Sequence, residues 1–131
     1  MTPGQPPEGI PLEFAVERDP AAGIATFRLR GAMSLWGMLD LREALAAALR
    51  NGYALHLLDL SGVWHINAKS LGILVERRDR AREAGGQLVL VAPPGPVREL
   101  LEAAGGYAIF AVAATGAEAQ ALLTPAGVAA G

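Results

Sequence analysis

Hydrophobic and polar residues alternate in two short stretches near the start of the chain. The alternation covers Leu12–Glu17 and Ile24–Arg30 and is typical of half-buried β-strands. Residues 19–23, Asp-Pro-Ala-Ala-Gly, are turn formers. We therefore predict a β-hairpin.

The rest of the chain alternates between stretches with helical spacing of apolar residues and short apolar runs. Apolar residues that recur every three or four positions predict amphipathic helices, and short apolar runs predict strands buried on both faces. Thr115 and Glu118 resemble a capping box at the start of the last helix. The predicted helices cover residues 35–50, 68–84, 97–104 and 115–123. The predicted strands cover residues 53–60, 87–92 and 108–113.

The element order is therefore β-β-α-β-α-β-α-β-α. Strands that alternate with helices predict an α/β fold with a mixed, mainly parallel sheet, in which the first hairpin strand is antiparallel. In such sheets the working surface usually lies at the carboxyl ends of the strands. Here these ends lead into residues 31–38, 61–70 and 93–96.

Length and composition predict one domain. The chain has 131 residues, enough for a single core, and 52% of them are hydrophobic. Residues 1–11 hold four prolines and two glycines and are expected to form a flexible lead-in. The predicted domain covers residues 12–124, and residues 125–131 form a small-residue tail.

Charge and cysteine content exclude several functions. The net charge of −2 argues against nucleic-acid binding, and the lack of cysteine excludes disulfides and thiolate metal sites. No apolar run reaches the roughly 20 residues of a membrane-spanning helix, and the start of the chain lacks signal-peptide features. We expect a cytoplasmic protein that does not insert into membranes.

Signatures of catalysis are missing from the sequence. There is no phosphate-binding loop, dinucleotide fingerprint or nucleophile elbow, and Ser61 reads as a turn residue after a strand. His56 is expected to pack within a strand, whereas His65 is expected near the surface. The acidic residues of the second helix interleave with arginines as on a solvated face. We expect no enzyme activity, no cofactor and no metal.

Residues 58–74, Leu-Asp-Leu-Ser-Gly-Val-Trp-His-Ile-Asn-Ala-Lys-Ser-Leu-Gly-Ile-Leu, resemble the signature of the STAS family, the anti-sigma factor antagonist-like domains. Residues 31–34, 41–45 and 86–110 fit other parts of that family's pattern. The resemblance extends over about Leu12 to Leu123 and implies a single-domain STAS-like fold.

In antagonists of this family, a serine is phosphorylated by an anti-sigma factor kinase, and the resemblance places that serine at Ala68. Alanine cannot accept phosphate. The neighbouring positions also depart from the pattern, because Asn67 replaces an aspartate, Lys69 a hydroxyl residue, and Ser70 a glycine. Ser70 is a less favoured substitute for phosphorylation, since it lies about 200° round the helix from residue 68.

The departures from the pattern suggest a surface for recognition. Asn67 is a favoured N-cap, and Lys69 opposes the helix dipole in the first turn, which suggests an acidic partner or ligand. Tryptophan and methionine are enriched at protein interfaces, although core packing remains open for each tryptophan. The predicted partner-binding residues are Ser34, Trp36, Met38, Trp64, His65, Asn67, Ala68, Lys69 and Ser70.

The leading hypothesis is a non-catalytic protein–protein interaction domain that is not phosphorylated at the usual position. Its partner would be an anti-sigma factor kinase or another signalling protein. The alternatives are a module that binds a small anion, such as a nucleotide or lipid head group, and an accessory subunit of a transporter. Homo-oligomerisation is left open.

Overall fold

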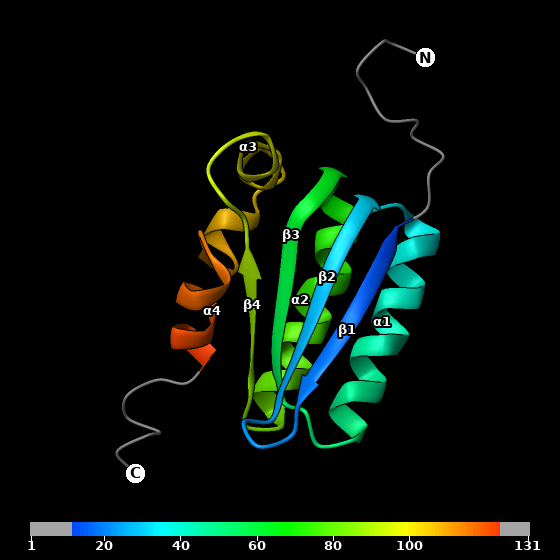
Figure 1. Cartoon of the computed structure of the whole chain (residues 1–131). Helices are drawn as coiled ribbons and strands as arrows, with labels where there is room; N and C mark the ends of the chain where they lie inside the picture. The colour runs from blue at the N-terminus through cyan, green and yellow to red at the C-terminus, as the bar shows by residue number, and fades with distance from the viewer. Residues whose placement is uncertain (1–11, 124–131) are drawn as a thin grey trace.

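Five strands form one sheet in the order β1-β2-β3-β4-β5 (Figure 1). The computed structural model describes residues 12–123, so the predicted lead-in 1–11 and tail 125–131 lie outside the described residues. β1 and β2 are antiparallel, and the other neighbouring strands are parallel, as predicted. The strands are β1 Glu13–Asp19, β2 Ile24–Ala32, β3 Leu55–His65, β4 Gln87–Val91 and β5 Ala111–Ala113. The helices are α1 Leu35–Arg50, α2 Ala68–Glu83, α3 Pro96–Ala103 and α4 Gly116–Leu123, with a 3-10 turn at Gly106–Ala108.

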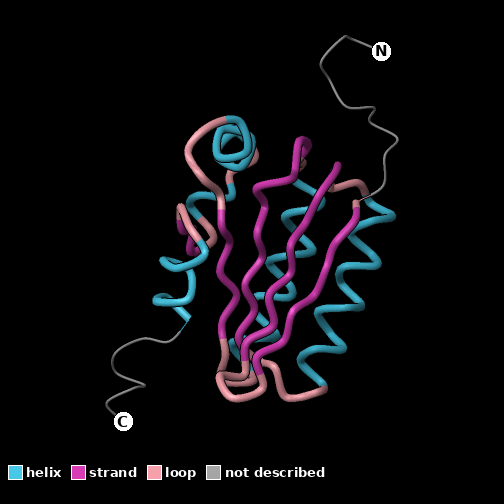
Figure 2. Tube along the Cα trace, in the orientation of Figure 1, coloured by secondary structure: helices cyan, strands magenta, loops and turns pink. Residues whose placement is uncertain are grey.

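The strand order decides which face each helix covers. β2, β3, β4 and β5 follow one another in sequence and in space, so right-handed crossovers put the connecting helices on one side of the sheet. Figures 1 and 2 show α1 and α2 behind the sheet, with α3 at its upper end. α4 follows the last strand and packs against the opposite face of β3 and β4.

The core is therefore divided by the sheet. The larger cluster lies between the sheet and α1, α2 and α3, and includes Phe27, Leu45, Leu58 and Leu101. A smaller cluster under α4 includes Leu57. Leu57 and Leu58 are both buried although they point to opposite faces, as predicted for a strand covered on both sides.

β3 is longer than predicted, and Ser61 and Gly62 do not end it. The strand continues to His65 because it carries two extra residues relative to β2: the register moves from Arg28–Asp59 to Arg30–Gly62, and again before His65. Gly62 suits this irregular pairing, since a Cβ there would lie 2.8 Å from the carbonyl oxygen of Leu29. The predicted turn at residues 61–62 is thus part of a bulged strand.

The last strand is shorter than predicted. Gly105 adopts a positive φ of 84°, and the chain then makes the 3-10 turn Gly106–Ala108 before β5 begins at Ala111. The capping of α4 agrees with the sequence: Thr115 Oγ1 accepts a hydrogen bond from the Glu118 amide at 3.1 Å, and Glu118 Oε2 accepts one from the Ala114 amide.

The exposed side of α2 is a network of ion pairs, as the sequence indicates. Arg80 contacts Glu83, Arg78 contacts Asp79, and Glu76 pairs with an arginine of α1. Such surface pairs contribute little stability each, typically below about 1 kcal/mol.

None of the helices within residues 12–123 has the length and apolar character needed to cross a membrane.

His56 is a buried histidine of the core, as predicted. It is 1% exposed, and its Nε2 donates a hydrogen bond to the Tyr53 carbonyl at 2.7 Å, while Nδ1 is buried without a partner. Burial lowers the pKa of His56 below its ordinary value of 6.5; the hydrogen bond to Tyr53 acts in the opposite direction, and the Arg77 guanidinium lowers the pKa further. The folded protein therefore holds a neutral imidazole.

This burial predicts a pH-dependent stability. Below about pH 6.5 the unfolded chain binds a proton at His56 that the folded protein does not, so stability falls as the pH drops below that value. Above it, the contribution is fully present. Urea unfolding between about pH 5 and pH 7.5 should give a smaller pH dependence in His56→Leu than in the wild type. His65→Gln, at an exposed position, should behave as the wild type; equal slopes in all three proteins would contradict the assignment.

Candidate functional site

The loops that precede α1 and α2 are joined at the carboxyl edge of the sheet. The Met33 amide donates a hydrogen bond to the His65 carbonyl at 2.9 Å, and Ala32 pairs with His65 at the end of the β2–β3 ladder. α1 begins after Ser34 and α2 after Asn67. Since the two helices pack side by side and the loops before them are joined, their first turns lie at the same edge of the sheet.

Asn67 caps α2, which confirms the interpretation made from the sequence. Its Oδ1 accepts a hydrogen bond from the Ser70 amide at 2.9 Å. The Ser70 hydroxyl donates to the Asn67 carbonyl at 2.7 Å and accepts from the Asn67 amide at 3.3 Å. Ser70 is only 3% exposed, so its hydroxyl serves the helix start and is not presented to a partner.

Ala68 and Lys69 occupy the exposed first turn of α2. Within residues 12–123, Lys69 has neither an ion pair nor a hydrogen bond to its side chain. A free cation close to the positive end of a helix is unfavourable for the isolated helix. Ala68, the position that the resemblance gives to the phosphorylated serine, presents a methyl group to solvent.

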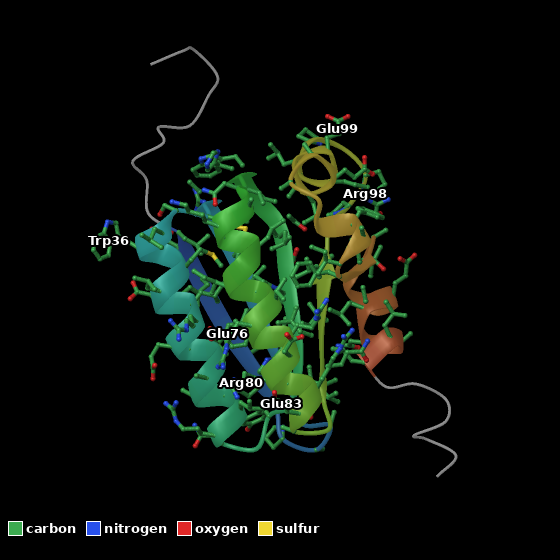
Figure 3. All side chains as sticks on the ribbon, turned by 180° about the vertical axis from the view of Figure 1, so that it is seen from behind. Trp36, Glu76, Arg80, Glu83, Arg98 and Glu99 are labelled. Atoms are coloured by element: carbon green, nitrogen blue, oxygen red, sulfur yellow. The ribbon has the colours of Figure 1, made fainter. Side chains whose placement is uncertain are left out.

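An exposed apolar stripe lies on the first turn of α1. Trp36 is 78% exposed, and Leu35 and Leu39 are 55% and 37% exposed. Figure 3 shows Trp36 extending outward from the start of the helix. We call Leu35, Trp36 and Leu39 the α1 stripe. Trp36 belongs to the predicted surface, whereas Leu35 and Leu39 do not, although the sequence shows their i, i+4 spacing on a face separate from the core positions.

The prediction that Met38 belongs to the partner-binding surface is wrong. Its side chain is fully buried in the main core, because residues 38, 41 and 45 share the inward face of α1. Met38 cannot contact a partner in this structure. Ser70 is corrected in the same way, since its side chain is enclosed by the capping box.

The other predicted residues are either exposed or half-buried. His65 is exposed, and Ser34 is half-buried at the N-cap of α1, where its side chain makes no capping bond. Trp64 is half-buried, with Nε1 buried and lacking a hydrogen-bond partner. The exposed part of the surface therefore consists of the α1 stripe, His65, Ala68 and Lys69.

This arrangement suits recognition. The apolar stripe offers area that a partner can cover, and Lys69 offers a charge that an acidic group can pair with.

Among residues 12–123, no three His, Asp or Glu side chains gather closely enough to hold a metal ion.

The fold is that of anti-sigma factor antagonists. The unphosphorylated form of the anti-sigma factor antagonist SpoIIAA superposes with a TM-score of 0.68 at 17% identity, over 84% of this chain and 95% of that one. An anti-sigma factor antagonist from Mycobacterium paratuberculosis gives 0.69 at 19% identity, over 92% and 98%. A candidate antagonist from Thermotoga maritima gives 0.72 at 21% identity, over 86% and 95%.

These structures show that the chain has the α/β fold of a STAS domain. Residues 16–107 match the family described as "Mlab, STAS domain", which is more than half of the chain. The protein belongs to this STAS family.

Proposed function

We propose that this protein is a non-catalytic STAS domain that binds another protein through the α1 stripe and the first turn of α2. The observation that carries the proposal is Trp36, which is 78% exposed in the first turn of α1. A large exposed aromatic side chain among other apolar ones is typical of an interface anchor.

The proposed interaction is not switched by phosphorylation. Ala68 has no hydroxyl group, and the hydroxyl of Ser70 is enclosed at the helix start. If the partner is an anti-sigma factor kinase in the cytoplasm, binding would be constitutive. The similarity to anti-sigma factor antagonists supports such a signalling partner. A transporter to which the chain is an accessory subunit could use the same surface, and the identity of the bound protein decides between them.

The test compares capture and affinity across matched variants. Proteins retained by the tagged wild type from its native cytosol are identified, and their affinity is then measured with purified components. Trp36→Ala should weaken binding by about 30-fold or more, the effect of losing a hot-spot residue, and Lys69→Glu should weaken an acidic partner's binding as well. Leu122→Ala, at an exposed apolar position on α4, and Arg18→Glu, on β1, should bind as the wild type.

If the wild type, Trp36→Ala and Lys69→Glu bind the partner with equal affinity, the proposed binding surface is wrong.

The second candidate function, binding of a small anion, rests on the unpaired, exposed Lys69. Nucleotide or lipid head-group binding that falls with salt and needs Lys69, but not Trp36, would favour that candidate instead.

A further inference from the structure

A groove between α1 and α2 continues from the α1 stripe. It has a volume of about 330 Å³ and is lined by Leu39, Arg42, Glu43, Ala46 and Arg77. Leu39 belongs both to the stripe and to the groove, so a partner that covers Trp36 would reach the groove as well. Figure 3 looks onto this face, with Trp36 at one end of α1 and Glu76 farther along the two helices.

Arg77 is the unusual residue of this groove. Its side chain is only 10% exposed, and its Nε is buried with no hydrogen-bond acceptor. The nearest carboxylate oxygen, Oε1 of Glu76, lies 3.6 Å from that nitrogen, and the same oxygen already accepts a hydrogen bond from Arg42 Nε at 3.1 Å. A guanidinium normally presents its N–H groups to a carboxylate as a fork.

The two carboxylates near the groove each accept a hydrogen bond from another arginine. Glu76 holds Arg42, and Glu43 holds the Nη2 of Arg50 at 3.0 Å. Arg77 is the cation of the groove whose Nε has a carboxylate only at ion-pair distance, 3.6 Å, and no hydrogen-bond acceptor. Because Leu39 and Ala46 form an apolar wall beside it, a protein side chain suits this place better than a free ion, which would leave that wall uncovered.

We propose that the groove receives an acidic side chain from a segment of the partner protein, with a neighbouring apolar side chain of that segment lying on Leu39 and Ala46. This inference rests on the proposed function, because the same segment would extend from the α1 stripe. The space is at the lower limit of ordinary ligand pockets, which fits one or two side chains.

The test uses the full chain labelled with nitrogen-15 and two blocked dipeptides, N-acetyl-Leu-Glu-amide and its neutral counterpart N-acetyl-Leu-Gln-amide. The Nε–Hε signal of each arginine reports its own surroundings. The glutamate peptide should shift the Arg77 signal saturably and bind about tenfold or more tightly than the glutamine peptide, since a charge-assisted hydrogen bond is lost in the latter. Arg80, exposed and paired with Glu83, is the internal control.

A variant of Arg77 tests the same inference without disrupting the fold. Arg77→Lys retains the charge but lacks the Nε–H group, so it should lose the preference for the glutamate peptide while its fold, followed by backbone signals, is kept. Equal responses of Arg77 and Arg80, or equal affinity for the two peptides, would overturn the inference.

The outcomes separate this inference from the proposed function. If partner binding depends on Trp36 but the groove does not prefer the acidic peptide, the inference about the groove is wrong and the proposed function stands. A selective Arg77 response in a chain whose partner binding ignores Trp36 would remove the proposed surface and leave the acidic subsite.

Discussion

Met38→Ala is expected to lower the free energy of unfolding by about 3 kcal/mol, whereas Trp36→Ala is expected to change it by less than about 0.5 kcal/mol. The two residues are one helical half-turn apart, but Met38 is fully buried and Trp36 is 78% exposed. Truncating Met38 removes buried surface and leaves a cavity in a packed core, while truncating Trp36 removes area that already faces water.

Urea unfolding of the two variants at neutral pH measures this contrast. Met38→Leu conserves most of the volume and should recover most of the lost stability. A large loss of stability in Trp36→Ala would show that the tryptophan packs against the protein, and its variant could no longer serve as a clean test of binding.

Gly86→Ala should destabilise the protein by about 3 kcal/mol, at the upper end of the cost of overpacking. A Cβ on Gly86 would lie 1.8 Å from the carbonyl oxygen of Ala54, and backbone atoms cannot move aside as a flexible side chain can. That carbonyl also accepts the Gln87 amide at 3.0 Å, so a shift would disturb the pairing of β3 and β4 at their starts.

Gly72→Ala provides the matched control. Gly72 lies within α2 and is exposed, and apart from the neighbouring backbone of α2 no heavy atom lies within 4 Å of the position its Cβ would take. The substitution should stabilise the protein by up to about 1 kcal/mol, because glycine is a poor helix former. Thermal unfolding of both variants checks the pair; a mild effect of Gly86→Ala would mean that the start of β4 can relax around the methyl group.

The proposed function separates recognition from phosphorylation. The start of α2 is held by the Asn67–Ser70 capping box, and the resemblance places the phosphorylated serine at Ala68. The exposed apolar groups of the proposed surface lie on α1. A protein built in this way is expected to bind its partner by surface burial, with its occupancy set by concentration and affinity.

Local sequence determined most of the elements. The helix at residues 35–50 is found as predicted because its apolar positions recur at helical spacing and Asn51-Gly52 follows it. The sequence predicts the Asn67 cap because capping involves atoms only three residues apart, Asn67 Oδ1 and the Ser70 amide. It predicts that His56 is a core residue because His56 lies in an apolar strand.

The tertiary structure decided what depends on distant neighbours. The length of β3 follows from its bulged pairing with β2, which no local pattern of residues 61–65 encodes. Whether Trp36 or Met38 faces water depends on which side of α1 meets the sheet. The Nε of Arg77 is buried because α1 and α2 pack together. Periodicity describes each element by itself, whereas burial and hydrogen-bond satisfaction are properties of the assembled layers, and these define the groove and the exposed stripe.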